Sequence, residues 1–263
     1  MQAIIYDIGK KWLMPRQDSA DALFEEKYIS LRQKEKRLYT DEELARLPLI
    51  EQNNLHYKEW RIRQQSCNRL VNYLGKKKGP LKILEVGCGN GWLSHRLSMV
   101  SGTFVTAIDI NAFELRQAAR VFAGVPGLQF IYGSIDSPEL VNRHFDIIVF
   151  AASIQYFRSL TDTLDHSMLL LKPGGEIHIL DSRLYRLGEL GPASQRTEKY
   201  YNDLGFPEMT GQYFHHCFNE LKPFDHKILY KPFSLGPVGR LAGLLQWSNN
   251  PFVWVSVKKK IAE

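Results

Sequence analysis

The chain has 263 residues with a total mass of 30.4 kDa, and 44% of them are hydrophobic while 24% are charged. This composition is that of an ordinary folded domain, and it excludes an intrinsically disordered or fibrous chain. No stretch reaches the roughly 18 consecutive apolar residues of a membrane helix, and the N-terminus lacks a signal-peptide pattern. We therefore expect a cytoplasmic protein with no membrane partner.

The formal net charge of +6 is concentrated in residues 1–80, which hold 16 Lys and Arg against 11 Asp and Glu. Because acidic residues interrupt this basic region, the pattern favours a solvated helical surface over a nucleic-acid surface. The three cysteines, Cys67, Cys88 and Cys217, form no C-x-x-C pair. They predict reduced thiols, with neither a disulfide framework nor a metal site.

Residues 18–78 contain several helix-like runs and no strand-like run. Asp18 or Ser19 can cap the first helix, and Thr40 with Glu43 forms a capping-box pattern before the second. Apolar residues at helical spacing predict that the third helix packs on the following domain. The residues of that face are Trp60, Arg63, Cys67, Leu70, Val71 and Leu74. We therefore expect a helical extension over residues 1–80.

From Lys82 onward, short β-branched runs alternate with amphipathic segments. Five strands are predicted, with the sequences KILEVG, TFVTAID, LQFIYG, FDIIVFAA and GGEIHILD. Each is followed by a segment long enough for a crossover helix, which predicts a doubly wound α/β fold with a mostly parallel sheet. Near the end, KILYKPF and PFVWVSVKK predict two more strands, which form an antiparallel pair.

A glycine-rich loop follows the first of these strands, with glycines at positions 87, 89 and 91. Such a loop lets the backbone turn tightly and approach a ligand closely. Trp92 stands where the dinucleotide fingerprint has glycine, which disfavours NAD. Asp109 ends the second strand 18 residues beyond Gly91, where a carboxylate can accept hydrogen bonds from both ribose hydroxyls. Together these features predict a ligand that contains a nucleoside.

Four motifs over about residues 80–182 resemble the class I S-adenosylmethionine-dependent methyltransferases, in particular those of the small-molecule, methyltransferase-11/12-like type. The motifs are E-V-G-C-G-N-G, A-I-D-I-N, F-D-I-I-V-F-A-A and L-K-P-G-G-E-I-H-I-L. The resemblance implies a Rossmann-like sheet of seven strands with an antiparallel last strand. It also implies that S-adenosylmethionine lies across the carboxyl ends of the first strands and leaves as S-adenosylhomocysteine.

The resemblance further implies a set of cofactor-binding positions. They are Glu85, Gly87, Cys88, Gly89, Gly91, Asp109, Ile110, Ser134, Ile135, Asp136, Ala151, Ala152 and Ser153. Relatives commonly end the third strand with G-D-x, whereas this chain has Gly133-Ser134-Ile135-Asp136, so the acid near adenine is either replaced by Ser134 or displaced to Asp136. Glu85 either orders the glycine loop or contacts the amino group of the cofactor.

Residues 81–263 are therefore expected to form the cofactor-binding domain, with an insertion at about residues 183–226 as a lid over the substrate. The insertion contains many aromatic residues and the pair His215 and His216. With Tyr156, these histidines are the candidates for acid–base work, although a structural role is favoured for the pair. Adjacent histidines rarely chelate one ion together, so no metal is expected.

These features predict methyl transfer from S-adenosylmethionine to an oxygen or nitrogen atom of a small-molecule substrate. The alternative is a tRNA- or rRNA-modifying methyltransferase that uses the basic N-terminal extension. A cofactor-binding protein without catalysis also fits, because methyl transfer leaves no unique residue signature. A cation within residues 56–63 could reach the carboxylate of the ligand, although a solvated helix face is favoured for any single one.

Overall fold

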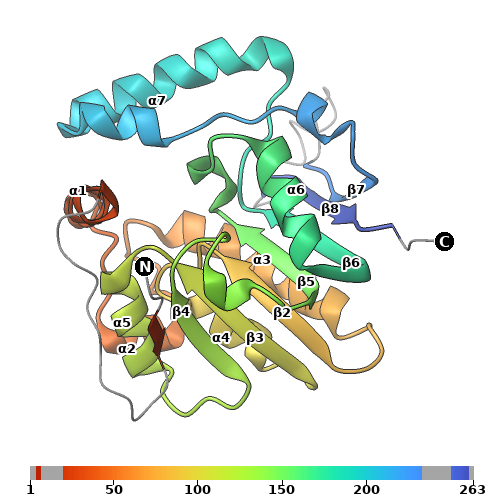
Figure 1. Cartoon of the computed structure of the whole chain (residues 1–263). Coiled ribbons are helices and arrows are strands. Elements are labelled where there is room, and N and C mark those ends of the chain that lie inside the picture. Colours follow the sequence, from red (N-terminus) through yellow and green to blue (C-terminus); the bar gives the residue numbers. More distant parts are fainter. Residues whose placement is uncertain (1–3, 7–19, 233–249, 261–263) are drawn as a thin grey trace.

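A single mixed sheet organises the part of the chain that the computed structural model describes, residues 4–6, 20–232 and 250–260 (Figure 1). Its eight strands lie in the order β1-β4-β3-β2-β5-β6-β8-β7. The neighbours from β4 to β6 pair in parallel, while β8 is antiparallel to both β6 and β7. The strands are β1 Ile4–Tyr6, β2 Leu81–Val86, β3 Thr103–Asp109, β4 Leu128–Tyr132, β5 Phe145–Ala151, β6 Leu171–Leu180, β7 His226–Tyr230 and β8 Trp254–Lys258.

The predicted seven-stranded, mostly parallel sheet with a reversed last strand is confirmed by β2 to β8. The sequence did not predict β1, which pairs antiparallel with β4 and places Tyr6 opposite Phe130. Three residues are too few to show the alternation from which a strand is predicted, so only the pairing reveals it.

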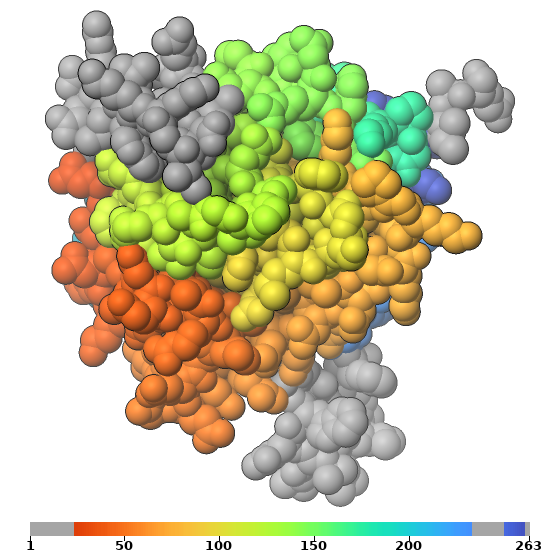
Figure 2. Space-filling view, turned by 90° about the horizontal axis from the view of Figure 1, so that it is seen from below, coloured from red at the N-terminus to blue at the C-terminus, as the bar shows by residue number. Residues whose placement is uncertain are grey.

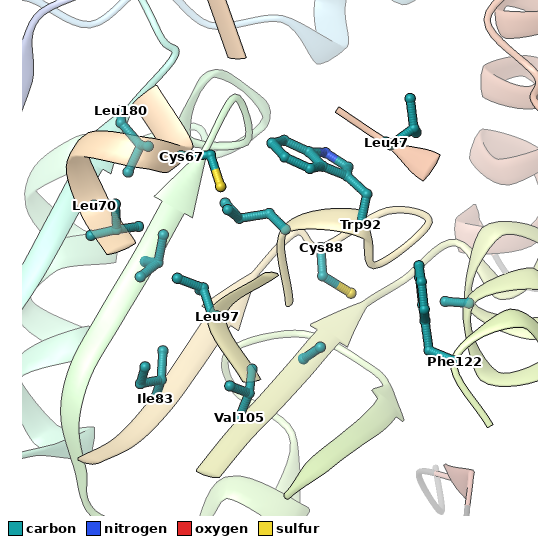
Figure 3. Packing of buried hydrophobic residues seen from close by; sticks show 14 of the residues in the cluster. Leu47, Cys67, Leu70, Ile83, Cys88, Trp92, Leu97, Val105, Phe122 and Leu180 are labelled. Carbon is teal, nitrogen blue, oxygen red and sulfur yellow. The ribbon is translucent and has the colours of Figure 1, made fainter. Parts of the chain in front are cut away.

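Both faces of the sheet are buried, because successive side chains of a strand point to opposite sides. Ile83 belongs to a core cluster on one face and Leu84 to a second cluster on the other. Figure 3 shows part of the first cluster, in which Trp92 and Leu97 of α4 lie with Ile83 and Val105 of the sheet. This two-sided burial explains why the strands form nearly continuous apolar runs in the sequence.

The helices of the sheet region are α4 Trp92–Ser98, α5 Ala112–Val121 and α6 Leu160–Leu170, with the 3-10 helices η1 Pro138–Leu140 and η2 Ile154–Tyr156. The expectation of a crossover helix after every strand is wrong between β4 and β5, where only η1 forms. Only residues 133–144 separate these two strands, which is close to the minimum length of about 10–12 residues for a crossover that contains a helix. Among the described helices, none combines the length and apolar character needed to cross a membrane.

Three helices precede β2 in the described part of the chain, namely α1 Ala20–Lys34, α2 Asp41–Arg46 and α3 Tyr57–Leu74. The predicted capping box of α2 is confirmed. The Glu43 N–H donates to Thr40 Oγ1 at 3.2 Å, and the Thr40 N–H donates to the Glu43 carboxylate at 2.8 Å. The predicted caps Asp18 and Ser19 of the first helix lie outside the described residues.

The apolar face of α3 packs into the core of the sheet. Trp60, Leu70 and Leu74 are buried in the same cluster as Ile83 of β2. Residues of α2 reach α5 through an ion pair between Asp41 and Arg120 at 2.7 Å. Figure 2 shows these red and orange N-terminal residues in contact with yellow and lime residues of the sheet region. The hydrophobic core is therefore shared between the N-terminal helices and the sheet.

Residues 183–226 contain η3 Leu187–Glu189, α7 Leu190–Leu204, η4 Pro207–Gln212 and η5 Phe218–Leu221. Figure 1 shows α7 above the sheet layer, with α1 near one end of α7. A small core cluster joins the two, since Leu31 of α1 packs with Tyr201 and Met209. An ion pair between Lys27 and Glu208 at 3.0 Å adds to this contact.

The shared core makes α3 part of the folding unit. Leu70 is completely buried, whereas Leu55, just before α3, is 74% exposed. Leu70→Ala should lower the free energy of unfolding by about 2 to 5 kcal/mol through the lost burial and the cavity that remains. Leu55→Ala should change it by less than about 0.5 kcal/mol. Urea denaturation measures both, and equal effects would contradict the packing described.

Candidate functional site

Glycines form the turn between β2 and α4 at the carboxyl edge of the sheet. Gly87, Gly89 and Gly91 all have left-handed φ angles, of +72°, +53° and +73°. A Cβ at Gly87 would lie 2.5 Å from Ser153 Cβ, and a Cβ at Gly91 would lie 2.5 Å from the Phe130 ring. Glycine is therefore required at both positions by conformation and by space.

Asp109 holds this loop from the end of β3. The Gly89 N–H donates to Asp109 Oδ2 at 2.6 Å, and the Asn111 N–H donates to Oδ1 at 2.8 Å. Burial raises the pKa of Asp109, and these backbone donors oppose the rise. A carboxylate has about four acceptor sites, so Asp109 can still accept a further hydrogen bond.

Two adjoining cavities open beside the loop. The larger has a volume of about 330 Å³ and extends from the glycine loop past Asp109 to Phe157. The smaller has a volume of about 100 Å³ and lies between the loop and α3. Five residues line both, so the cavities form one continuous site. They are Tyr28, Gly87, Gly89, Glu114 and Ala152.

The structure brings most of the predicted cofactor-binding residues together on these walls. Those that line one cavity or both are Glu85, Gly87, Cys88, Gly89, Asp109, Ile110, Ser134, Ile135, Ala151, Ala152 and Ser153. Gly91 lies outside the lining residues and packs the start of α4 against Phe130. Asp136 also lies outside them, because it is exposed and pairs with His166 at 2.9 Å. Of the two alternatives after β4, Ser134 is therefore the one at the cavity.

Glu85 is a buried carboxyl group on the wall of the smaller cavity. It accepts a short hydrogen bond from the Ser94 hydroxyl of α4. Burial raises the pKa of Glu85 to about 8, since the Ser94 hydroxyl offsets only part of the effect and the charge of Asp109 adds to it. A nearby cation would favour the ionised form of this group.

Glu114, in the first turn of α5, is a site residue that the sequence interpretation missed. It lines both cavities, and a Cβ at Gly89 would lie 3.3 Å from its Oε2. Burial raises the pKa of Glu114 to about 7, with the charge of Asp109 adding to the rise while Arg32 opposes it. Its position one turn after the predicted ribose acid is the signal that could have identified it.

Three arginines line the smaller cavity, namely Arg32, Arg37 and Arg63. Arg63 lies in the segment from which the sequence predicted a cation, whereas Arg32 of α1 and Arg37 were missed. Burial raises the pKa of Glu59, but hydrogen bonds from Arg37 and the charge of Arg63 outweigh this and bring it to about 2. Glu59 therefore pairs with two of the three arginines as a carboxylate.

The predicted acid–base residues lie in different places. Tyr156 lines the larger cavity, but neither histidine is among the lining residues. His216 is buried, and its Nε2 donates to the Ile154 carbonyl oxygen at 3.1 Å. His215 lies 2.9 Å from the Thr197 hydroxyl, and burial lowers its pKa. The contacts of both histidines are therefore with the protein around the insertion.

Comparison with known proteins gives a consistent result. The model of a methyltransferase-domain family matches residues 77–235. The chain is 35% identical over 102 residues to an uncharacterized methyltransferase of Mycobacterium tuberculosis, covering 39% of this chain and 51% of that protein. It is 29% identical over 123 residues to the malonyl-[acyl-carrier protein] O-methyltransferase of Halalkalibacterium halodurans, covering 43% of this chain and 45% of that protein. The chain thus spans about half the length of the curated relatives it matches.

Solved structures share the fold at low sequence identity. The magnesium protoporphyrin IX methyltransferase of Synechocystis, solved with bound S-adenosylhomocysteine, superposes with a TM-score of 0.57 at 14% identity, covering 92% of this chain and 100% of that one. The plantazolicin methyltransferase BpumL, solved with S-adenosylhomocysteine and a monoazolic desmethylPZN analog, superposes with a TM-score of 0.53 at 17% identity, covering 91% of this chain and 97% of that one.

The raised pKa of Glu85 predicts a pH dependence of stability in the ligand-free protein. Its folded-state pKa of about 8 exceeds its ordinary value of 4.5, so the folded state retains the proton more strongly than the unfolded state. The stabilising contribution of protonated Glu85 is therefore fully present at acidic pH and is lost as the pH rises to about 8. Across this range, the free energy of unfolding of wild type should fall by about 2 to 5 kcal/mol more than that of Glu85→Gln.

Thermal or urea unfolding of both proteins between pH 5 and pH 9 measures this difference. The exposed Glu198 supplies a matched control, and Glu198→Gln should keep the wild-type pH dependence. If the free energies of unfolding of wild type and Glu85→Gln changed in parallel with pH, the raised pKa of Glu85 would be contradicted.

Proposed function

Because this chain belongs to the class I S-adenosylmethionine-dependent methyltransferases, we propose that it transfers a methyl group from this cofactor to an oxygen or nitrogen atom of a small-molecule acceptor. The observation that supports this proposal best is the position of Asp109. Its carboxylate holds the glycine loop and at the same time lines the larger cavity. A ribose placed there would meet both the carboxylate and the loop backbone.

The lining residues fit each part of the cofactor. In this proposal Asp109 accepts hydrogen bonds from the ribose hydroxyls, and Ile110 and Ile135 provide apolar contacts for the adenine. At the smaller cavity, Glu85 faces the amino group and Arg63 the carboxylate of the methionine part. Opposite charges are thereby matched in a partly buried site, where such pairs are stronger than in water.

When bound, S-adenosylmethionine supplies a methyl group that its sulfonium already activates. The work of the protein is then to orient the acceptor, exclude water and neutralise charge. Of the three predicted catalytic residues, only Tyr156 lines the cavity, and we propose that it contacts the acceptor. A lid built from α1 and residues 183–226 would exclude water, since the cluster of Leu31, Tyr201 and Met209 joins these segments beside the cavity.

Two further features agree with an oxygen acceptor and a cytoplasmic location. The protein from Halalkalibacterium halodurans is named as an O-methyltransferase, which supports an oxygen acceptor. The three cysteines, Cys67, Cys88 and Cys217, are buried and free, which suits a reducing compartment.

Calorimetric titration with S-adenosylhomocysteine tests the cofactor site. Asp109→Asn keeps the shape of the side chain but removes its charge, so it should weaken binding by about 2 kcal/mol. Asp136→Asn is the matched control, because Asp136 is exposed and lies outside the cavity walls. It should leave the affinity unchanged. Equal affinities for wild type and Asp109→Asn would refute the ribose assignment.

A further inference from the structure

Tyr28, Arg32 and Tyr156 form a hydrogen-bonded group, called here the tyrosine–arginine trio. One nitrogen of Arg32, Nη2, donates to the Tyr28 hydroxyl at 2.8 Å and to the Tyr156 hydroxyl at 3.1 Å. The other terminal nitrogen, Nη1, donates to the Glu35 carboxylate at 2.8 Å. The two phenol rings meet edge to face with centroids 6.0 Å apart. A single guanidinium thus fixes both phenols.

The trio leaves two hydroxyl hydrogens available. A phenol oxygen that accepts from Arg32 still has its own O–H to donate. Within the described ranges, neither the Tyr28 nor the Tyr156 hydroxyl donates to a protein acceptor. Burial raises the pKa of Tyr28 well above its usual value, so its phenol keeps the proton at neutral pH. Contact with a cation makes each O–H a stronger donor.

The position of the trio connects it to the reacting end of the proposed cofactor. Tyr28 lines both cavities, Arg32 the smaller and Tyr156 the larger. Ala152, at the end of β5, also lines both. Aromatic side chains also lie at the larger cavity. They include Phe24 and Phe157 on the cavity wall, with Tyr213 edge to face against Tyr156.

From this arrangement, and on the basis of the proposed methyl transfer, we infer that the tyrosine–arginine trio binds the acceptor and that the acceptor is a carboxylate attached to an apolar group. Two O–H donors beside a cation suit one oxygen of a carboxylate, which leaves its other oxygen to react. The aromatic walls suit the apolar remainder.

Methyl transfer to a carboxylate is a reaction that the residues lining the two cavities can support. The reacting oxygen forms the new O–CH3 bond while the methyl–sulfur bond breaks and its electron pair stays on sulfur. The products are a methyl ester and S-adenosylhomocysteine, and no proton is released. A neutral alcohol or amine would instead need a base, and neither histidine lines the site. Glu114, which lines both cavities, could act as the base for such a rival acceptor, so its variant is part of the test.

The experiment uses the full-length protein saturated with S-adenosylhomocysteine, titrated with benzoate, phenylacetate and cinnamate and with the matching neutral amides. At least one acid should bind with an affinity at least about tenfold higher than that of its amide, because the amide lacks the negative charge. Tyr28→Phe and Tyr156→Phe should each reduce this preference to within about threefold, while the affinity for S-adenosylhomocysteine stays within about threefold of wild type.

Tyr73→Phe is the matched control, because the Tyr73 hydroxyl donates to Glu176 at the opposite end of α3 from the cavity. It should keep the full preference for the acid. With S-adenosylmethionine in place of its product, mass spectrometry should detect the methyl ester of the acid that binds.

Three results would overturn the inference. The first is that wild type prefers none of the acids over its amide, and the second is that the preference survives in both phenylalanine variants. The third is that the protein methylates the alcohol or amine with the same apolar group and that Glu114→Gln abolishes this reaction. A wild-type protein that fails to bind S-adenosylhomocysteine would contradict the proposed function itself, which separates the two failures.

Discussion

The hydrogen bond from the Gly89 N–H to the Asp109 carboxylate is the interaction on which the site depends. It joins the loop after β2 to the end of β3 at 2.6 Å. Glycine is needed there because the loop backbone is left-handed at positions 87, 89 and 91. A carboxylate held in this way is pre-oriented, so a ligand that uses it needs no rearrangement of the loop.

A second layer, formed by α1 and the insertion, completes the cavity above this loop. Arg32 connects the two phenols of the trio to Glu35, and Glu35 also accepts from Tyr200 of α7. The Phe113 N–H of α5 donates to Glu25 of α1 at 2.7 Å, which joins α1 to α5 beside the larger cavity. Polar contacts from α1 thus reach both the insertion and the sheet region, and its residues Phe24 and Tyr28 line the larger cavity.

The sheet and the glycine loop were predictable because their causes are local. Buried strands such as β5 form apolar runs, and a glycine loop followed by Asp109 has a recognisable spacing. Arg32 was not predictable, since a charged residue on an amphipathic helix usually faces solvent and only tertiary packing turns this one toward the cavity. The same packing places His216 against Ile154, although aromatic density alone suggested a site there.

We propose that the cavity beside Asp109 and the glycine loop holds the nucleoside of the methyl donor. A crystal structure of the protein grown with S-adenosylhomocysteine tests this directly. We expect ribose density within hydrogen-bonding distance of the Asp109 carboxylate, with the methionine part toward Glu85. Density for the nucleoside at another position, or a crevice closed by side chains at saturating ligand, would contradict it.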